Sequence, residues 1–437
     1  MIAEILTIGD EVVRGEIVDS NKAYLAEQLL TLDVECHHQV SVRDDPADME
    51  DALRRAAERS DVVLVSGGLG PTRDDLTTEV LAATFGRQLV LDEESLEAIR
   101  AFFRSVGREM SENNAKQAYF PEGADVLANP EGTAPGFMID EKGSAIFCLP
   151  GVPRELRRMM EEQVLPRLAK RSAHRDAGVS RSRLLRTFGI GESSLDRELQ
   201  DLAADSDLAL GFRTAFPDNY LRPVARGATA EAAEARLEEL VGALRKRLGS
   251  LVYGEGDDGM PVVVGRLLRE RGLRLAVAES CTGGLIAQQI TSVPGASEFF
   301  SGGVVAYSDS AKSALLGVPS DRIETFGAVS EPVVRAMAEG VRERFGADLG
   351  LATSGISGPG GGSKEKPVGL VYVGLSAPEG VHCDEFVFAL DRARHRALTA
   401  QVGLDWVRRS LLGFELVGPS LVRRGGASAP GSAGGLS

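Results

Sequence analysis

Short apolar runs alternate with amphipathic stretches along two long parts of the chain, and this alternation restricts its fold more than any other feature. In the first part, apolar runs at 4–8, 34–42 and 62–65 are separated by stretches of helical periodicity at 21–30 and 46–59. Strands that alternate with helices in this way are typical of a parallel sheet covered by helices. The sequence therefore predicts an α/β domain over residues 1–170.

The second part shows the same kind of alternation without an obvious sequence repeat. Strand candidates at 273–278, 303–307 and 348–354 are interleaved with helical stretches, and a long helical stretch closes this part at 393–412. We expect a second α/β domain over 260–414. The predicted fold class is thus α/β, with two three-layer α/β domains.

The segments between and after these domains have a different character. A polar, basic run at 167–183 lacks periodicity and marks a boundary, and a small α+β connector is expected over 171–253. The turn-rich stretch 254–260 is expected to be a linker. The last residues, 415–437, hold too few apolar side chains to order themselves and are predicted to form a disordered tail.

Composition excludes several classes of protein. A formal charge of −15 over 437 residues disfavours bulk binding to nucleic acid. The four cysteines lie far apart, without a CxxC pair, so neither a disulfide framework nor a structural zinc site is expected. Acidic residues surround the short apolar run at the amino terminus, unlike a secretory signal, and no apolar stretch approaches membrane-spanning length. We expect a soluble, cytoplasmic protein with no membrane partner.

The motif AESCTGG at 278–284 places Ser280 where a strand ends and a helix begins. Unpaired amides and a positive dipole end make such a junction suitable for a nucleophile. A structural alternative is that Ser280 or Thr282 caps the helix. Cys281 is another candidate nucleophile, although no histidine lies near it in sequence to activate it.

Further along, AYSDSAK at 306–312 brings Tyr307 and Lys312 to a second strand end. A lysine serves as a general base only when desolvation or positive charge lowers its pKa, and the alternative is an exposed lysine on a helix surface. The glycine-dense loop at 354–362 offers amides to a phosphate or an oxyanion. Arg392 is suited to bidentate capture of a phosphate monoester.

Together these segments resemble the nicotinamide-nucleotide amidase domain of the competence/damage-inducible protein A (CinA) family. The resemblance implies hydrolysis of nicotinamide mononucleotide to nicotinate mononucleotide and ammonia, by a serine/lysine mechanism without a cofactor. It implies Ser280 as nucleophile, Lys312 as its base and Tyr307 as a residue that orients or polarises this pair. The substrate-binding residues that it implies here are Arg392, Thr282, Gly283, Ser354, Gly355 and Gly358. The chain departs from the family pattern at Asp309, where Asn is common, and at Leu390, where Gly is common.

In the N-terminal part, the motif SGGLGPTRDD at 66–75 follows an apolar run and precedes a helix. Its glycines, Gly67, Gly68 and Gly70, together with Thr72, are placed to present amides and a hydroxyl to phosphate. Asp74 and Asp75 favour a divalent cation there, and Asp10 and Glu11 are further candidate ligands. The alternative is that the two aspartates only complement a helix dipole.

Two further loops, at 129–137 and 149–156, add Asn129, Thr133 and Gly151 to the candidate binding residues. With the glycine motif they resemble the molybdopterin-binding domain found at the amino terminus of the same family. In that family context the resemblance implies hydrolysis of ADP-ribose to AMP and ribose 5-phosphate, dependent on Mg²⁺, Mn²⁺ or Co²⁺. The connector resembles the family's KH-like unit, but it has no G-x-x-G loop with flanking basic residues, so nucleic acid is not an expected partner.

The favoured hypothesis is a homodimeric, bifunctional hydrolase of pyridine-nucleotide (NAD) salvage that acts on nicotinamide mononucleotide and ADP-ribose. Two alternatives remain open. One is a non-catalytic recruitment or regulatory protein in competence or the DNA-damage response. The other is a pterin-binding protein of molybdenum-cofactor metabolism, since a fold does not fix a function.

Overall fold

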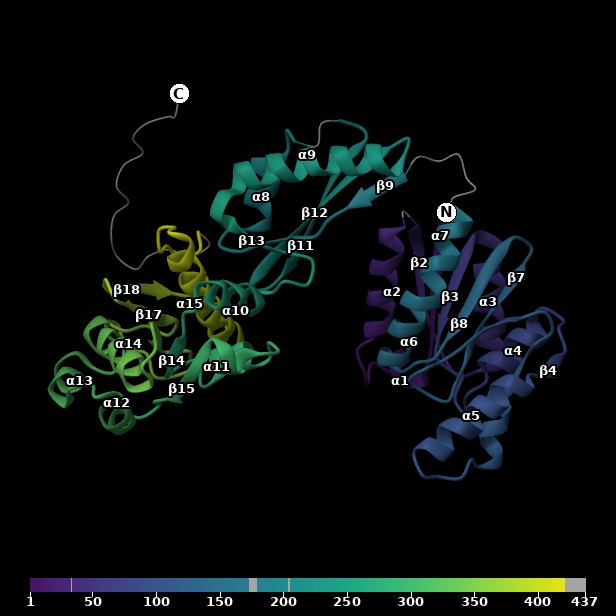
Figure 1. The fold of residues 1–437 in the computed structure, drawn as a ribbon, viewed down its shortest axis with the longest axis horizontal. Helices are drawn as coiled ribbons and strands as arrows, with labels where there is room; N and C mark the ends of the chain where they lie inside the picture. Colours follow the sequence, from purple (N-terminus) through teal and green to yellow (C-terminus); the bar gives the residue numbers. More distant parts are fainter. Residues whose placement is uncertain (33, 173–178, 203–204, 421–437) are drawn as a thin grey trace. The chain divides into compact units, whose positions relative to one another are not determined.

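The computed structural model describes residues 1–32, 34–172, 179–202 and 205–420 (Figure 1). The chain separates into two compact units. One consists of Met1–Ser182 with Arg226–Glu234, and the other of Arg183–Ala225 with Ala235–Ser437. None of the helices in the described ranges is long and apolar enough to cross a membrane.

The first unit contains a six-stranded sheet in the order β2-β1-β3-β8-β7-β6. Its strands are β1 (Ile2–Ile8), β2 (Glu35–Val42), β3 (Val62–Ser66), β6 (Asp125–Leu127), β7 (Gly136–Glu141) and β8 (Ser144–Leu149). Strands β2, β1, β3 and β8 are parallel to one another. Strand β7 runs antiparallel to β8, and β6 runs antiparallel to β7. The sheet is therefore mixed, not parallel throughout as the sequence pattern suggested.

Helices cover both faces of this sheet, as expected for a three-layer domain. Along β3, Val62 and Leu64 join the core on one face and Val63 and Val65 the core on the other. Because successive strand residues point to opposite faces, the unbroken apolar run of β3 is buried on both sides. The helices are α1 (Asp10–Val13), α2 (Ser20–Thr31), α3 (Pro46–Arg59), α4 (Thr77–Thr84), α5 (Glu93–Ser105), α6 (Pro153–Met159) and α7 (Leu165–Ser172).

A small ribbon and short helical turns complete this unit. Strand β4 (Leu89–Leu91) pairs antiparallel with β5 (Tyr119–Pro121). A 3₁₀ helix spans Glu112–Ala118, a π-helical turn spans Met160–Val164, and β9 spans Val179–Ser182. The helix α7 extends into the run that the sequence marked as an aperiodic boundary, whereas residues 173–178 of that run lie outside the described residues.

The connector has the expected α+β composition. Its strands follow the order β11-β12-β10-β13. They are β10 (Leu185–Thr187), β11 (Leu208–Ala215), β12 (Asp218–Gly227) and β13 (Val252–Glu255). The helices are α8 (Glu192–Leu199), α9 (Ala230–Leu248) and a 3₁₀ turn at Gly249–Leu251. Leucines of α8, α9 and the sheet form its core.

The C-terminal domain has a five-stranded sheet in the order β15-β14-β16-β17-β18. The strands are β14 (Leu275–Glu279), β15 (Phe300–Val305), β16 (Leu349–Gly355), β17 (Leu370–Ala377) and β18 (Gly380–Val387). Strands β15, β14 and β16 are parallel, whereas β17 and β18 are antiparallel. This sheet is also mixed. A two-residue turn between Ala377 and Gly380 joins β17 and β18 as an antiparallel hairpin.

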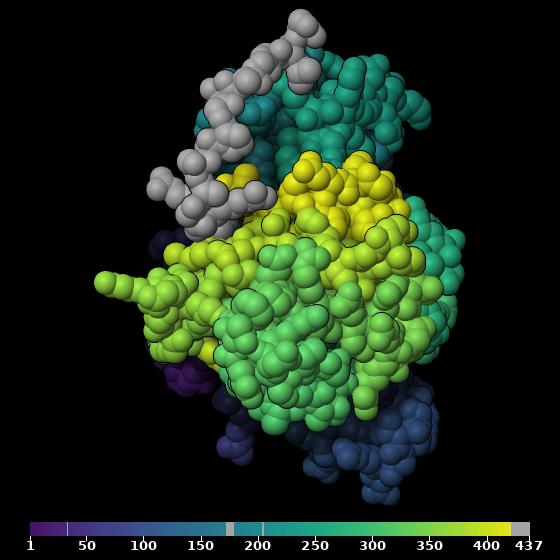
Figure 2. Space-filling model, turned by 90° about the vertical axis from the view of Figure 1, so that its left-hand side faces the viewer, coloured from purple at the N-terminus to yellow at the C-terminus, as the bar shows by residue number. Residues whose placement is uncertain are grey.

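Two helical layers enclose the C-terminal sheet. One layer contains α10 (Met260–Arg271), α11 (Leu285–Thr291) and α15 (Arg392–Leu412), and the other α12 (Asp309–Leu316), α13 (Ser320–Phe326) and α14 (Glu331–Phe345). A 3₁₀ turn at Ala296–Glu298 precedes β15. Residues of the second layer are drawn in green in Figure 2.

Two predicted boundary segments differ from the structure. Gly254 and Glu255 belong to β13 and Met260 begins α10, so the expected linker is shorter than its turn-rich composition suggested. In the predicted disordered tail, the first residues are held in place. The carbonyl of Val417 accepts from the indole of Trp406 at 3.0 Å, and the amide of Ser420 donates to the carbonyl of Gly189 at 2.8 Å. The tail beyond 420 lies outside the described residues.

Candidate functional site

Ser280 follows the last residue of β14 and lies at the edge where the parallel strands of the C-terminal sheet end. Its side chain is almost buried. The helix α11 is capped by Glu279, whose carboxylate accepts from the amides of Gly284 at 3.0 Å, Ile286 at 3.1 Å and Ala287 at 2.8 Å. The hydroxyl of Thr282 instead contacts that of Thr353 at 2.9 Å. The capping alternative for Ser280 and Thr282 is therefore wrong, since Glu279 performs that role.

Lys312, on α12, is the basic group that meets Ser280. Its Nζ lies 3.4 Å from the Ser280 Oγ, 3.0 Å from the carbonyl of Ala306 and 3.2 Å from the carbonyl of Tyr307. Only 1% of Lys312 is exposed, which excludes the alternative of a surface lysine. Burial lowers the pKa of the Lys312 amine, and the nearby carboxylate of Asp309 opposes this shift.

The three contacts of Lys312 also fix the direction of its lone pair. A neutral amine has two N–H groups and one lone pair. The two carbonyls can only accept hydrogen bonds, so the N–H groups of the neutral form are directed to them. The lone pair is then left for the hydroxyl proton of Ser280. The geometry thus suits proton transfer from the serine to the lysine.

The side chain of Tyr307 is 63% exposed. Its phenol lies 3.5 Å from Nη2 of Arg392, and only its main-chain carbonyl contacts Lys312. The sequence interpretation gave the Tyr307 side chain a role in orienting the serine and lysine. The structure places the backbone of Tyr307 at that position and directs its ring toward Arg392.

A cavity of about 280 Å³ opens above this pair. The glycine-dense loop after β16 forms one wall, and Arg392, the first residue of α15, lies at the rim, where its Nη1 donates to the carbonyl of Gly358 at 3.0 Å. Among the predicted residues, those that line the cavity are Ser280, Lys312, Tyr307, Ser354, Gly355, Gly358 and Arg392. Thr282 and Gly283 do not line it; the carbonyl of Thr282 is bound by the guanidinium of Arg396, at 2.6 and 3.2 Å.

Cys281, the other candidate nucleophile, follows Ser280 directly in the chain. Its side chain is buried, and burial raises the pKa of the thiol to about 12. The thiol therefore stays protonated at neutral pH and is a poor nucleophile.

Sequence reasoning missed a buried serine–histidine pair in the same wall. The Oγ of Ser357 lies 2.9 Å from Nδ1 of His395, and Nε2 of His395 lies 3.1 Å from the carbonyl of Gly369. The two side chains are 38 residues apart in the chain, so no local motif joins them. The only available signal was the position of Ser357 inside the glycine-dense loop.

The N-terminal domain contains a larger cavity, of about 790 Å³, at the edge where β1, β3 and β8 end. Among the predicted residues, those that line it are Gly67, Gly68, Gly70, Thr72, Thr133, Gly151, Asp10, Glu11, Asp74 and Asp75. Asp44 and Glu155, which the sequence did not indicate, line it too. Gly67 has φ +108°, and a Cβ there would lie 2.3 Å from the carbonyl of Ile8, so this turn requires glycine.

Asn129 does not line this cavity but holds one of its loops. Its amide donates to the carbonyl of Ala134 at 2.9 Å and to the carboxylate of Glu155 at 2.7 Å. Its carbonyl accepts from the amides of Glu131 and Gly132, both at 3.0 Å. Asn129 is thus a residue that shapes the loop carrying Thr133.

The predicted metal ligands share a cavity but are not assembled into a ligand set. The carboxylate of Asp75 accepts from the amide of Thr72 at 2.8 Å and from its hydroxyl at 2.6 Å, and Asp10 forms an ion pair with Arg14. Within the described residues, no group of three or more His, Cys, Asp or Glu side chains is placed to hold an ion. Burial raises the pKa of Asp44, and the charges of Glu11, Asp10 and Asp75 raise it further, whereas a hydrogen bond from the Asp10 amide lowers it. The donor chemistry suits a hard cation, although the geometry is not preformed.

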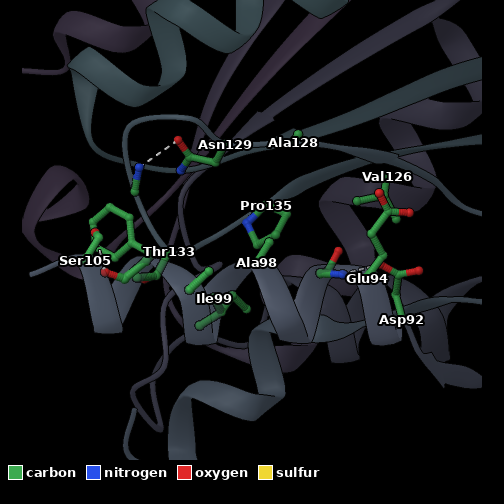
Figure 3. Close-up of a pocket in the computed structure, with 14 residues that line it drawn as sticks. Asp92, Glu94, Ala98, Ile99, Ser105, Val126, Ala128, Asn129, Thr133 and Pro135 are labelled. Carbon is green, nitrogen blue, oxygen red and sulfur yellow. Dashed lines mark hydrogen bonds between the residues drawn. The ribbon is translucent and has the colours of Figure 1, made fainter. Parts of the chain in front are cut away.

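A second cavity of the N-terminal domain, of about 520 Å³, lies between α5 and the loop that follows β6 (Figure 3). Ala98 and Ile99 of α5 face Pro135 across it, and Asn129 and Thr133 lie at one end. Thr133 lines both cavities. The two hollows therefore meet at the same loop.

Comparison with protein families assigns each domain. Residues 4–170 match the family described as "Probable molybdopterin binding domain", residues 182–254 the "Damage-inducible protein CinA KH domain", and residues 257–411 the "CinA C-terminal domain".

Similar proteins of known sequence match over nearly the whole chain. A "CinA-like protein" of Dictyoglomus thermophilum is 43% identical, over 94% of this chain and 100% of that protein. A "CinA-like protein" of an Anaeromyxobacter species is 44% identical, over 93% of this chain and 98% of that protein. A solved structure, of the protein CinA with unknown function from Thermoplasma acidophilum, is 34% identical and covers 38% of this chain and 97% of that one, with a TM-score of 0.35.

The fold and these matches define a three-domain α/β protein, with a molybdopterin-binding-like domain, a KH-type connector and a C-terminal domain that carries a buried serine–lysine pair. Such an arrangement is compatible with an enzyme. The chain belongs to the CinA family, the competence/damage-inducible proteins.

Proposed function

We propose that the C-terminal domain is an amidase that hydrolyses nicotinamide mononucleotide to nicotinate mononucleotide and ammonia. The observation that carries this proposal is the contact between Ser280 and the buried Lys312 inside a cavity with an arginine at its rim. An amide is a poor electrophile, so its hydrolysis needs an activated nucleophile and stabilisation of the oxyanion.

In the proposed mechanism, the Ser280 Oγ attacks the carboxamide carbon while its proton passes to the lone pair of Lys312. The tetrahedral intermediate collapses when the C–N bond breaks, and ammonia leaves with the proton returned by Lys312. Water then attacks the acyl-enzyme ester while Lys312 accepts its proton. The bond between the acyl carbon and the Ser280 Oγ breaks, Lys312 returns the proton to that oxygen, and nicotinate mononucleotide leaves. This cycle needs an amine that is neutral before each attack, which agrees with a pKa lowered by burial.

The rest of the cavity supplies binding. The amide of Ile356 already donates to the carbonyl of Leu370 at 2.8 Å, so other amides of the stretch Ser354–Gly358 are proposed to stabilise the oxyanion. Arg392 is exposed, and its Nη1 donates one hydrogen bond to the carbonyl of Gly358. Its remaining N–H groups are proposed to bind the 5′-phosphate. The phenol of Tyr307, next to Arg392, is proposed to contact the same phosphate or the ribose, instead of acting on the serine–lysine pair.

The decisive experiment measures ammonia release from nicotinamide mononucleotide by the purified protein and its Ser280→Ala variant. The wild type is expected to release ammonia and the variant to release none above background, while both unfold at the same temperature because the change removes one oxygen. Ser363→Ala, in the same glycine-rich segment but outside the cavity lining, is the matched control and should keep full activity. Equal activity of Ser280→Ala and the wild type would refute the proposal.

For the N-terminal domain we propose metal-dependent hydrolysis of ADP-ribose to AMP and ribose 5-phosphate. The supporting observation is the cavity in which the glycine turn at Gly67–Gly70 faces a concentration of carboxylates from Asp10, Asp44 and Asp75. If a divalent cation bound there, these carboxylates would hold it, and it would neutralise part of the charge of a pyrophosphate.

This second activity is tested by product analysis with and without a chelator. Chelation is expected to stop ADP-ribose cleavage and to leave ammonia release unchanged. Asp75→Asn should weaken cleavage and Asp140→Asn, an exposed carboxylate outside the cavity, should not. A purified protein that retains a pterin and shows no cleavage of ADP-ribose would favour the pterin-binding alternative.

A further inference from the structure

The buried pair of Ser357 and His395 lies in the wall of the amidase cavity and has no part in the mechanism described above. Ser357 lines the cavity together with Ser280 and Lys312. His395, on α15, is 0% exposed, and Ser357 is 5% exposed. Both ring nitrogens of His395 have partners, namely the hydroxyl of Ser357 at 2.9 Å and the carbonyl of Gly369 at 3.1 Å.

These two contacts determine which ring nitrogen carries the proton. A carbonyl oxygen only accepts, so Nε2 of His395 must donate to Gly369. The same carbonyl accepts from the amide of Phe388 at 2.8 Å, which holds it in place. Burial, and then the nearby charge of Arg392, lower the pKa of His395, so the ring is neutral and Nδ1 presents a lone pair.

The tautomer of His395 in turn determines the direction of the Ser357 hydroxyl. A serine has one hydroxyl proton, and Ser357 donates it in a hydrogen bond to Nδ1 of His395. Only the oxygen lone pairs of Ser357 then remain for a ligand in the cavity. Toward a ligand that contacts it, the hydroxyl is therefore an acceptor, although a free serine can donate as well.

We propose that Ser357, set by His395 as a hydrogen-bond acceptor, selects a carboxamide over a carboxylate in the amidase cavity. This inference rests on the proposed function, because it concerns the substrate and product of that reaction. A carboxamide has an NH₂ group that donates to the oxygen of Ser357. A carboxylate has only acceptor oxygens, which face the same lone pairs without a proton between them. The substrate is thus bound and the product is released.

The test measures equilibrium binding by calorimetry in a Ser280→Ala background, in which the ligand is not turned over. The probes are nicotinamide mononucleotide and nicotinate mononucleotide. One hydrogen bond of this kind implies that the amide binds about 10-fold more tightly than the acid. Adding Ser357→Ala should bring the ratio of the two dissociation constants close to one, mainly by weakening the amide. Adding Ser363→Ala, the matched serine control, should leave the ratio unchanged.

A second variant separates polarity from packing. His395→Phe keeps a buried ring but removes the acceptor, so the Ser357 hydroxyl is free to donate to a carboxylate, while Gly369 keeps its bond from Phe388. Binding of the acid should then strengthen relative to the amide, a gain that loss of packing does not produce. If this variant fails to fold, the ratio in Ser357→Ala decides alone.

The possible failures are distinct. An unchanged ratio in Ser357→Ala, an equal weakening of both ligands, or a parent that binds amide and acid equally would overturn the role of Ser357. Binding of neither nucleotide by the folded parent would instead reject the proposed substrate, and with it any selection between these two ligands.

Discussion

Replacing Lys312 by Met tests the mechanism most directly. Methionine is of similar length and apolar, so it fills the space of a side chain that is 1% exposed while removing the amine. In the part of the chain that the structure describes, Lys312 is the only basic side chain seen in hydrogen-bond contact with the Ser280 Oγ. We therefore expect the full effect of losing a general base, a fall in kcat of about 10,000-fold, or about 5.5 kcal/mol in activation free energy.

The assay is the rate of ammonia release from nicotinamide mononucleotide, with KM measured in parallel. Because Lys312 contacts Ser280 and two main-chain carbonyls, and is not among the residues proposed to bind the phosphate, KM should change by less than about threefold. Lys312→Arg should be no more active, since a guanidinium stays protonated at any accessible pH. A loss of less than about 10-fold in a folded Met variant, or recovery of activity with Arg, would refute proton transfer to this amine.

Three other outcomes follow from the same contacts. Asp309→Asn removes the charge that opposes the lowered pKa of Lys312, so the rise of kcat/KM with pH should move to lower pH; a shift to higher pH contradicts this electrostatic reasoning. Cys281→Ala should keep most of the ammonia release, because the thiol stays protonated, and a dead but folded variant would transfer the nucleophile to sulfur. The carboxylate of Asp405 pairs with both Arg408 and Arg409, and all three side chains are buried. Asp405→Ala should therefore lower the free energy of unfolding, measured by urea titration, by about 3–5 kcal/mol. A loss below about 1 kcal/mol would show that these ion pairs are dispensable for stability.

The local pattern of the sequence placed Ser280 and Lys312 each after a strand, and the family resemblance joined them in one site. Each follows a strand that ends at the same edge of the sheet, and β14 and β15 are parallel neighbours, so residues just beyond them lie close together. The same rule placed Gly67, Thr72 and Gly151 around one N-terminal cavity.

Other features depend on contacts that no local pattern encodes. The ring of Tyr307 and the pairing of Ser357 with His395 follow from the docking of α15 beside the loop after β16. The antiparallel pairing of β7 with β8 has a local cause instead. A tight turn at Lys142 and Gly143, both with positive φ, joins the two strands as a hairpin, which the alternation of strands and helices does not indicate.

The carboxylate of Glu279 at the start of α11 affects how an anionic ligand could bind beside Ser280. That carboxylate already occupies three of the amides to which an anionic group is attracted at a helix start, and its own charge repels a phosphate. Under the proposed function, the phosphate of the ligand is therefore left to the guanidinium of Arg392, while its amide reaches Ser280, which lines the same cavity. On that proposal the length of the ligand matters as well as the group that reacts, and free nicotinamide, which has no phosphate, would lack the contact with Arg392.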